Sequence, residues 1–298
     1  MDASLPRLRR LAVSQELYRW LTLASAVMLV VIIASGTSVR LTGSGLGCLD
    51  WPGCTAGDPL PNSGYHSFVE FSNRIVSAIT IFATLGAFVA TLLYPRAPRW
   101  ARWVAGLAFA GTLAQAPLGA ITVHYKLNPL LVGSHFLLTF VVLALGVVVA
   151  LEAWQIRGEP VPLRIRQLAL VVGAALCVLL VTGALSTAAG PHSGSVDVPR
   201  IWKLHSAVWL HVRATAVFGL AFLGLIALLG LRSSRHFIGA LVLLGLFLVQ
   251  MVVGEVQYRT HLPIGLVFVH VTLAAIIWAT AVVFIATMWR PWRNAPAK

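Results

Sequence analysis

The chain has 298 residues, of which 58% are hydrophobic and only 10% are charged. Most of it therefore lacks the polar surface that a soluble domain of this size needs. The net charge of +13 is typical of nucleic-acid-binding proteins, but here the basic residues fall in separate segments rather than on one face, which excludes that class.

Eight apolar runs in the sequence are long enough to cross a lipid bilayer. A helix rises about 1.5 Å per residue and the hydrocarbon core is about 30 Å thick, so one crossing takes about 20 apolar residues. In chain order the runs cover residues 17–39, 67–93, 101–123, 129–153, 167–188, 203–231, 236–256 and 263–289. The sequence therefore predicts an all-α integral membrane protein with eight transmembrane helices in contact with membrane lipid.

The basic residues between the apolar runs predict the orientation of the helices. With the N-terminus in the cytoplasm, 15 of the 22 arginine and lysine residues lie in cytoplasmic segments and five in outer segments, and the other two lie inside the runs. The outer five are Arg40, Lys126, Arg200, Lys203 and Arg259. Such an excess is typical of cytoplasmic loops, so both termini are expected there. The first run is too long for the apolar part of a cleavable signal peptide and is expected to stay as a helix.

Polar and glycine positions recur at fixed spacings, which predicts two copies of one four-helix unit. At a spacing of 135 residues the aligned pairs are Gln115 and Gln250, Gly119 and Gly254, His135 and His270, and Glu70 and His205. At a spacing of 147 residues Gly36 aligns with Gly183. We expect residues 1–155 and 156–298 to form two four-helix halves that run the same way through the membrane, related by an axis along its normal.

The first outer loop is about twelve residues longer than its counterpart near residues 190–200, which is the difference between the two spacings. The extra segment contains Cys48 and Cys54. An oxidising compartment outside the cytosol would allow these two to form a disulfide, and two free thiols are the alternative. Cys177 lies in the middle of the fifth run and is most simply a small core residue. An insertion in one copy only predicts that the two halves have different roles.

Four ionisable residues lie at one depth, within the first turns from the outer ends of the second, fourth, sixth and eighth runs. They are Glu70, His135, His205 and His270. Such a group is costly in hydrocarbon and needs a partner or a function. Two neutral imidazoles on facing helices make the axial ligand pair of six-coordinate haem, and we expect His205 and His270 to do so. His211, about 120° away round the same helix, is the alternative to His205. Histidines bonded only to protein groups are the other interpretation.

The second run carries a different polar set from the sixth. His66, Glu70, Asn73 and Arg74 fall on one helical stripe, so a carboxylate stands where the sixth run has an imidazole. One interpretation is that Glu70 and Arg74 form an ion pair that makes their burial tolerable. The other is that Glu70 is catalytic, beside a substrate haem that is bound by His135 and open to chemistry on its other side.

The sequence resembles the haem A synthase family of the bacterial plasma membrane in three stretches. They are GTSVRLTGSGLGCLDWPGC from Gly36 to Cys54, EFSNR from Glu70 to Arg74, and GSHFLLT from Gly133. The most specific part is the RLTGSGL run followed by DWPxC. The eight apolar runs, the duplicated unit and the cysteine pair in the first outer loop match the family as well.

The resemblance implies an oxidoreductase that converts haem O to haem A by oxidising a ring methyl group to a formyl group through successive hydroxylations. It implies a haem b cofactor in the C-terminal half and a haem O substrate in the N-terminal half. It also implies a haem O synthase upstream and a haem–copper oxidase, whose assembly uses haem A, downstream. A disulfide in the first outer loop, matching Cys48 and Cys54, belongs to the same expectation and is linked in the family to haem transfer.

The family's functional residues map onto specific positions of this chain. The two haem b ligands map to His205 and His270, and the glutamate and histidine of the substrate site map to Glu70 and His135. In many members the histidine of the sixth helix directly precedes an arginine. Here His211 stands two residues before Arg213, and His205 fits a different variant of the pattern.

The chain departs from the family on the second helix. Many members have a histidine three residues after the glutamate, where this chain has Asn73. The substrate haem is therefore expected to be ligated by His135 alone or to take a sixth ligand from elsewhere, such as His66. Asn73 and Arg74 are expected to contact the substrate haem.

Three other functions compete with this interpretation. A dihaem electron-transfer cytochrome predicts a matched histidine pair in both halves, and Glu70 and Asn73 count against it. A transporter predicts helices broken at the bilayer midplane, yet Pro117 corresponds to Val252 in the second half. A haem-handling membrane protein without catalytic activity is the third alternative.

Overall fold

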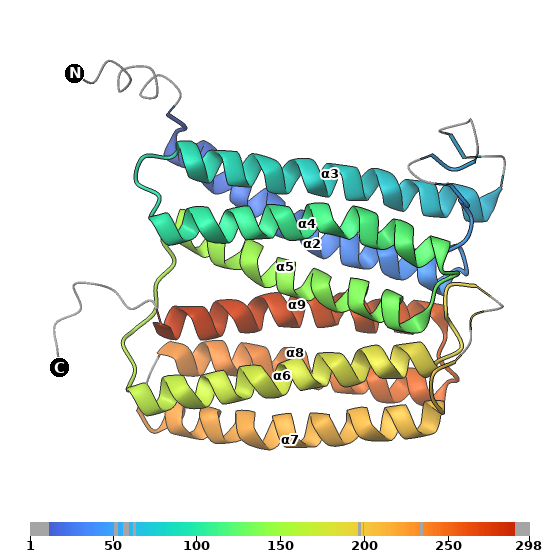
Figure 1. Cartoon of the computed structure of the whole chain (residues 1–298). Coiled ribbons are helices and arrows are strands. Elements are labelled where there is room, and N and C mark those ends of the chain that lie inside the picture. Colours follow the sequence, from blue (N-terminus) through green and yellow to red (C-terminus); the bar gives the residue numbers. More distant parts are fainter. Residues whose placement is uncertain are drawn as a thin grey trace, which may run out of the picture.

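The computed structural model of the chain describes residues 12–50, 53–55, 60–61, 64–195, 198, 200–232 and 235–289. Within them lie eight α-helices (Figure 1). They are α2 (Gln15–Leu41), α3 (Tyr65–Leu93), α4 (Arg99–His124), α5 (Pro129–Ala153), α6 (Leu163–Ala189), α7 (Leu204–Gly230), α8 (Arg235–Arg259) and α9 (Ile264–Trp289). Each is long and apolar enough to cross a membrane. The eight predicted runs are confirmed, with ends that differ by four residues at most.

Local capping explains where some of these helices begin. The side chain of Ser14 accepts a hydrogen bond from the Leu17 amide at 3.2 Å, which satisfies one of the free N–H groups at the start of α2. At the start of α5, Asn128 accepts from the Leu130 amide at 3.0 Å, and Pro129 occupies the first helical position, where no N–H is needed.

The helices of each half pack in the same cyclic order. In the first half α2 packs against α3 and α5, and α4 packs against the same two helices. In the second half α6 packs against α7 and α9, and so does α8. The halves meet where α9 packs against α2 and α5, and where α5 packs against α6. Figure 1 shows α9 and α5 side by side between the two halves.

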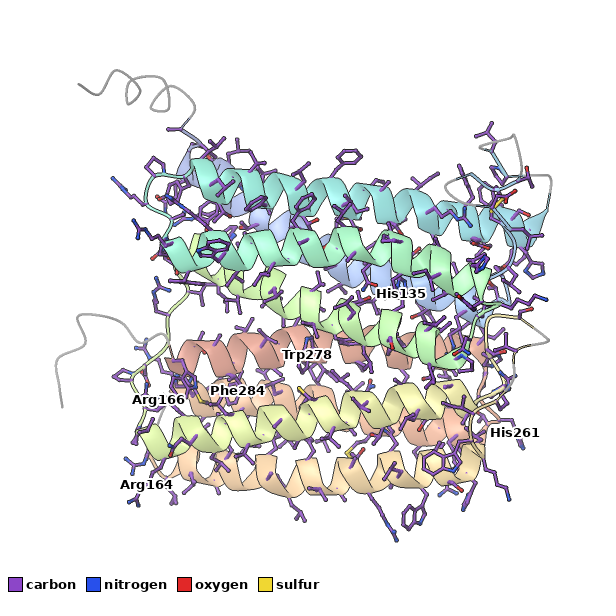
Figure 2. The ribbon with its side chains drawn as sticks, viewed as in Figure 1. His135, Arg164, Arg166, His261, Trp278 and Phe284 are labelled. Carbon is purple, nitrogen blue, oxygen red and sulfur yellow. A yellow bond between two sulfur atoms is a disulfide. The ribbon has the colours of Figure 1, made fainter. Side chains whose placement is uncertain are left out.

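The junction between the halves is an apolar cluster. Leu29 of α2, Phe140 and Leu143 of α5, and Ala275 of α9 are buried in it. The indole N–H of Trp278, labelled on α9 in Figure 2, donates to the Phe140 carbonyl oxygen at 2.7 Å. This bond satisfies a polar group that would otherwise be buried in hydrocarbon, so it ties α9 to α5.

The turns before α5 and α9 have the same unusual backbone. Lys126 and Leu127 have positive φ angles of 48° and 59°, and His261 and Leu262, which lie 135 residues later, have 64° and 60°. Non-glycine residues seldom adopt this conformation. The turns also share their closing bonds, from the Leu127 amide to the Thr122 oxygen at 2.8 Å and from the Leu262 amide to the Gln257 oxygen at 2.7 Å. These matched turns support the predicted duplication of residues 1–155 and 156–298.

The ends of the bundle separate the residues that the sequence assigned to opposite sides of the membrane. Figure 2 shows Arg164 and Arg166 at the end opposite His261. The start of α2 and the end of α9 both lie at the arginine end (Figure 1). The cytoplasmic position of that end stays a prediction, and residues 1–11 and 290–298 lie outside the described part of the chain.

Candidate functional site

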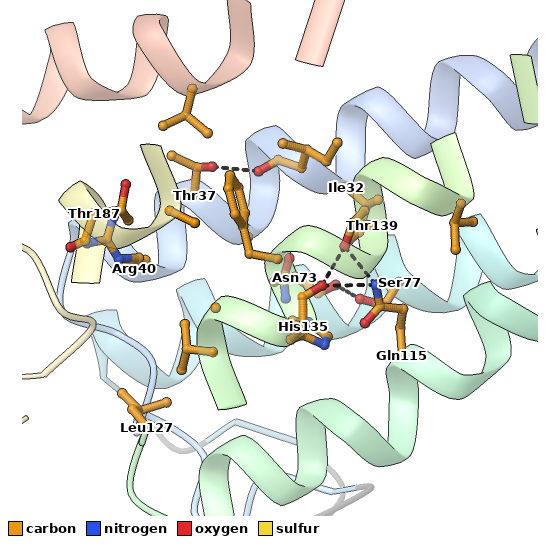
Figure 3. A pocket seen from close by; sticks show the side chains of 18 of the residues that line it. Ile32, Thr37, Arg40, Asn73, Ser77, Gln115, Leu127, His135, Thr139 and Thr187 are labelled. Carbon is orange, nitrogen blue, oxygen red and sulfur yellow. Dashed lines mark hydrogen bonds between the residues drawn. The ribbon is translucent and has the colours of Figure 1, made fainter. Parts of the chain in front are cut away.

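A cavity lies among the four helices of the first half. Its lining comes from α2, α3, α4 and α5, with contributions from the outer end of α6, the segment that follows it, and α9. Its walls are mostly apolar, and its polar lining residues include Asn73, Gln115 and His135 (Figure 3). The empty space, counted to its open mouth, is about 1330 Å³.

His135 is held in this cavity through its backbone. Its carbonyl oxygen accepts hydrogen bonds from Gln115 Nε2 at 3.1 Å and from Thr139 Oγ1 at 3.0 Å (Figure 3). The imidazole passes close to Gly119, where an added Cβ would lie 3.7 Å from its Cε1. The ring nitrogen Nδ1 is buried and has no hydrogen-bond partner among the described residues. A buried polar atom of this kind is costly unless a ligand satisfies it.

Asn73 lines the same cavity from α3. Its amide oxygen Oδ1 is also buried without a hydrogen-bond partner among the described residues. It lies opposite Gly36 of α2, where an added Cβ would be 4.0 Å from that oxygen. The cavity therefore brings together Asn73 and His135, as the sequence predicted, and presents an unsatisfied polar atom from each.

The second half repeats the arrangement around His270. Gln250 Nε2 donates to the His270 carbonyl oxygen at 3.0 Å, the counterpart of the bond from Gln115 to His135. The Nδ1 atom of His270 is likewise buried without a partner in the described part of the chain. An added Cβ at Gly254 would lie 3.0 Å from the imidazole, so any side chain there would push the ring aside.

His211 of α7 lies near His270, close enough for the two imidazoles to interact electrostatically. An added Cβ at Gly183 would lie 3.2 Å from the His211 ring, and Nδ1 is hydrogen-bonded to Thr182 Oγ1 at 3.1 Å. Thr182 already donates its single hydroxyl proton to the Leu179 oxygen at 3.0 Å. Nδ1 of His211 must then carry the proton, which leaves Nε2 with a free lone pair.

His205 lies elsewhere. It is exposed at the outer end of α7, beside Trp202 and Trp209 on the surface. Its Nδ1 is 3.4 Å from the Tyr258 hydroxyl. The structure thus brings His211, rather than His205, to His270.

A second sequence spacing would have identified His211. Gly36 faces Asn73 as Gly183 faces His211, so α3 and α7 correspond at a spacing of 138 residues. The hydroxyl groups of Ser77 and Thr215, one turn further along, donate to the backbone oxygens of Asn73 and His211 respectively. Because loops of unequal length separate the helices, no single spacing aligns all of them.

Glu70 is 5% exposed and does not line the cavity. One carboxylate oxygen accepts from Arg74 at 2.7 Å and the other accepts from the Cys48 amide at 2.8 Å. Arg74 also donates to the backbone oxygens of Cys48, Asp50 and Gly53. The Glu70–Arg74 ion pair that the sequence allowed is present, and it fastens the first outer loop to α3.

The cysteine loop is closed by a disulfide between Cys48 and Cys54. Both residues are fully buried. An added Cβ at Gly47 would lie 2.4 Å from the His66 carbonyl oxygen, so only glycine permits this close approach of the loop to α3. His66, the other candidate for a sixth ligand, is exposed and hydrogen-bonded to Ser44 Oγ at 2.9 Å. It does not line the cavity.

Most of the sequence matches a single protein family. The family is COX15-CtaA, described as cytochrome oxidase assembly protein, and the match covers residues 18–65 and 59–282. The chain belongs to this family.

Individual relatives are similar over a shorter region. Over 124 residues the chain is 31% identical to "Heme A synthase" of Bacillus mycoides (strain KBAB4). It is 30% identical to the proteins of the same name from Bacillus cereus (strain AH187) and Bacillus anthracis (strain A0248). In each case the aligned part is 41% of this chain and 40% of the relative. The chain thus spans less than half the length of the relatives that it matches.

The position of Glu70 in this COX15-CtaA member predicts how the disulfide is protected. Replacing Glu70 by Ala removes the acceptor for the Cys48 amide and the partner of Arg74, so the loop should open more often. A hydrogen bond to a charged group contributes about 1.5–3 kcal/mol, so we expect the disulfide to be reduced roughly tenfold faster. Thiol alkylation over time in a mild reductant measures this rate.

Glu255→Ala is the matched control, because Glu255 and Arg259 form an i,i+4 ion pair at the outer end of α8, away from the cysteine loop. It should leave the reduction rate unchanged. A Glu70→Ala protein whose disulfide is reduced at the wild-type rate would show that Glu70 does not hold the loop.

Proposed function

We propose that this protein is a haem A synthase of the bacterial plasma membrane, which oxidises a ring methyl group of haem O to a formyl group. The observation that carries the proposal is an asymmetry between two similar sites. The second half has two imidazoles near each other, His211 and His270. The first half has a cavity with one imidazole, His135, and Asn73 in the position that corresponds to His211.

The residues of the second half fit a haem b cofactor. His211 offers Nε2 as a lone-pair nitrogen, and Thr182 fixes the tautomer of its ring as a second-shell partner does in metal sites. His270 has a buried nitrogen without a partner in the described part of the chain. We therefore propose His211 and His270 as the axial ligands, in place of the expected pair His205 and His270. Haem b bound there would supply one-electron transfer.

The residues of the first half fit the substrate. Haem O is a large apolar ring, and the mostly apolar cavity contains one imidazole that can bind its iron. Asn73 offers an amide oxygen rather than an imidazole on the neighbouring helix. Since an amide is a much weaker ligand for haem iron than an imidazole, the substrate site differs chemically from a saturated bis-histidine site. This difference suits a ring that must react rather than only pass electrons.

The overall oxidation removes four electrons from the methyl carbon. In the first hydroxylation a C–H bond is replaced by C–OH, and in the second the same carbon becomes a geminal diol. Loss of one water molecule from the diol leaves the formyl group. The chain's own contribution is to hold the ring in the cavity with His135 and to exclude water with the apolar walls of α2 and α5.

The role of Glu70 is proposed to be positional. Sequence reasoning predicted a catalytic carboxylate that stabilises charge or accepts a proton, and that role stays a prediction. Both oxygens of Glu70 are engaged by Arg74 and the Cys48 amide, which supports a role in holding the disulfide loop. Arg74, expected to contact the substrate, is engaged with the same loop.

A dihaem electron-transfer cytochrome is the second candidate function. It requires two comparable ligand pairs, and the cavity of the first half offers Asn73 where the second half offers His211. The family, cytochrome oxidase assembly protein, also favours a biosynthetic role over a purely electron-carrying one. The physiological partners proposed here are a haem O synthase that supplies the substrate and a haem–copper oxidase that receives the product.

The ligand proposal predicts three distinct spectra. His270→Ala and His211→Ala should each abolish the low-spin haem b spectrum, because a single imidazole cannot saturate the iron. His205→Ala should retain it, since His205 is exposed at the end of α7. Absorbance and electron paramagnetic resonance spectra of the purified proteins measure this. Loss of the low-spin signal in His205→Ala with retention in His211→Ala would restore the ligand pair expected from sequence.

The substrate proposal is tested at His135. His135→Ala removes the only imidazole that lines the cavity within the described residues, so haem O should accumulate and haem A should fall by at least tenfold. The low-spin haem b spectrum should persist, because His211 and His270 are unchanged. Extracted haems are identified by chromatography and mass spectrometry. Normal haem A production by a well-folded His135→Ala protein would exclude this cavity as the substrate site.

A further inference from the structure

Arg40 lies in the last turn of α2 and lines the same cavity as His135. Figure 3 shows it beside Thr187, on the opposite side of the cavity from Gln115. Leu127, Ser193 and Val198 of the outer turns line the cavity as well. The guanidinium group is therefore at the outer end of the proposed substrate site.

The charge of Arg40 is not neutralised within the described part of the chain. The four ion pairs found there are Glu70–Arg74, Glu152–Arg157, Glu159–Arg235 and Glu255–Arg259. Arg40 donates one hydrogen bond, from Nη2 to the Thr187 carbonyl oxygen. A guanidinium has five N–H donors and cannot lose its charge. Such a group inside a membrane protein needs an anionic partner or a function.

A second cation strengthens the positive charge at this end of the cavity. Arg200 lies close enough to Arg40 for their charges to repel, and its Nη2 donates to the Pro191 oxygen at 2.7 Å. The outer turns that carry these residues are joined by a bond from the Gly45 amide to the Gly194 oxygen at 3.0 Å. Two arginines are thus held together at the mouth, although their mutual repulsion opposes folding.

A purely structural role accounts for only part of this arrangement. Arg40 is at the C-terminal end of α2 and bonds to a carbonyl at the C-terminal end of α6, where a cation is favourable. That contact uses one donor of five and leaves the charge uncompensated. It also gives no reason for Arg200 to lie nearby.

We propose that Arg40, supported by Arg200, binds the carboxylate side chains of a tetrapyrrole substrate in this cavity. This inference rests on the proposed function. Haem rings carry two propionate groups on one edge, and these anions need a cation once they leave water. Guanidinium groups bind carboxylates through paired, charge-assisted hydrogen bonds. The ring would then enter the apolar cavity with its iron toward His135 and its carboxylates at the outer end, so that Arg40 sets the orientation of the substrate.

The test compares two probes on the full-length protein in detergent. Iron protoporphyrin IX has free carboxylates, and its dimethyl ester has the same ring without the charges. Binding at the first-half site is the absorbance change that is lost in His135→Ala. We expect the wild type to bind the acid roughly tenfold or more tightly than the ester, as charge-assisted hydrogen bonds predict. In Arg40→Met the affinity for the acid should fall to that for the ester, while the affinity for the ester is unchanged.

Three further variants guard against a loss of folding. Arg40→Lys keeps the charge and should retain part of the preference for the acid. Arg213→Met removes an arginine that stacks on Trp209 of α7 and should leave both affinities at the wild-type values. Asp197, an acidic residue outside the described part of the chain, is tested by Asp197→Asn, which should keep the preference.

Different results would overturn different claims. Equal binding of the acid and the ester by the wild type, or an Arg40→Met protein that keeps the preference, would overturn the role of Arg40. So would equal losses of both affinities in Arg40→Met that Arg40→Lys does not restore, because they indicate a structural residue. If neither probe binds at the His135 site of the wild type, the proposed haem substrate fails as well.

Discussion

A buried imidazole nitrogen in a membrane bundle has no water to bind, so it needs either a protein partner or a ligand. In this protein two imidazoles, those of His135 and His270, are held at equivalent places by glutamines that bond to their backbone oxygens. The glutamines fix the helices and leave the rings themselves unsatisfied. The rest of the proposed function depends on this arrangement, because a haem iron would satisfy both rings.

The two halves differ on the helix that faces each of these histidines. On α7, Gly183 leaves space for His211, and on α3, Gly36 leaves space for Asn73. The same packing therefore presents a strong ligand in one half and a weak one in the other. The cysteine loop adds a second asymmetry, since Glu70 and Arg74 fasten it to α3 at the outer side of the first half. One duplicated bundle can in this way hold a permanent cofactor in one half and a reacting ring in the other.

The sequence predicted the helices well because apolar length alone determines what can cross a bilayer. It also predicted the cysteine pair, which the structure joins, and it identified Asn73 and His135, which share a cavity. It chose His205 over His211 because one spacing was applied to all helices. The spacing between α3 and α7 differs by three residues, and a shift of three residues turns a side chain by about 60° round the helix.

Two other features could not be read from the sequence. Glu70 was expected beside the substrate, but whether a buried carboxylate faces a cavity or a loop depends on the path of residues 47–54, which no periodicity describes. Arg40 was counted only as a basic residue of an outer segment. Its place at the mouth of the cavity depends on how the turns after α2 and α6 meet, through Gly45 and Gly194.

The most direct test of the account is to identify the haems that the protein carries. The full chain would be purified from cells that make haem O, and its haems extracted and identified by mass spectrometry. The account predicts haem B together with haem O or haem A in the wild type. A preparation that contains no haem would contradict the account and would favour a transporter built on the same duplicated bundle.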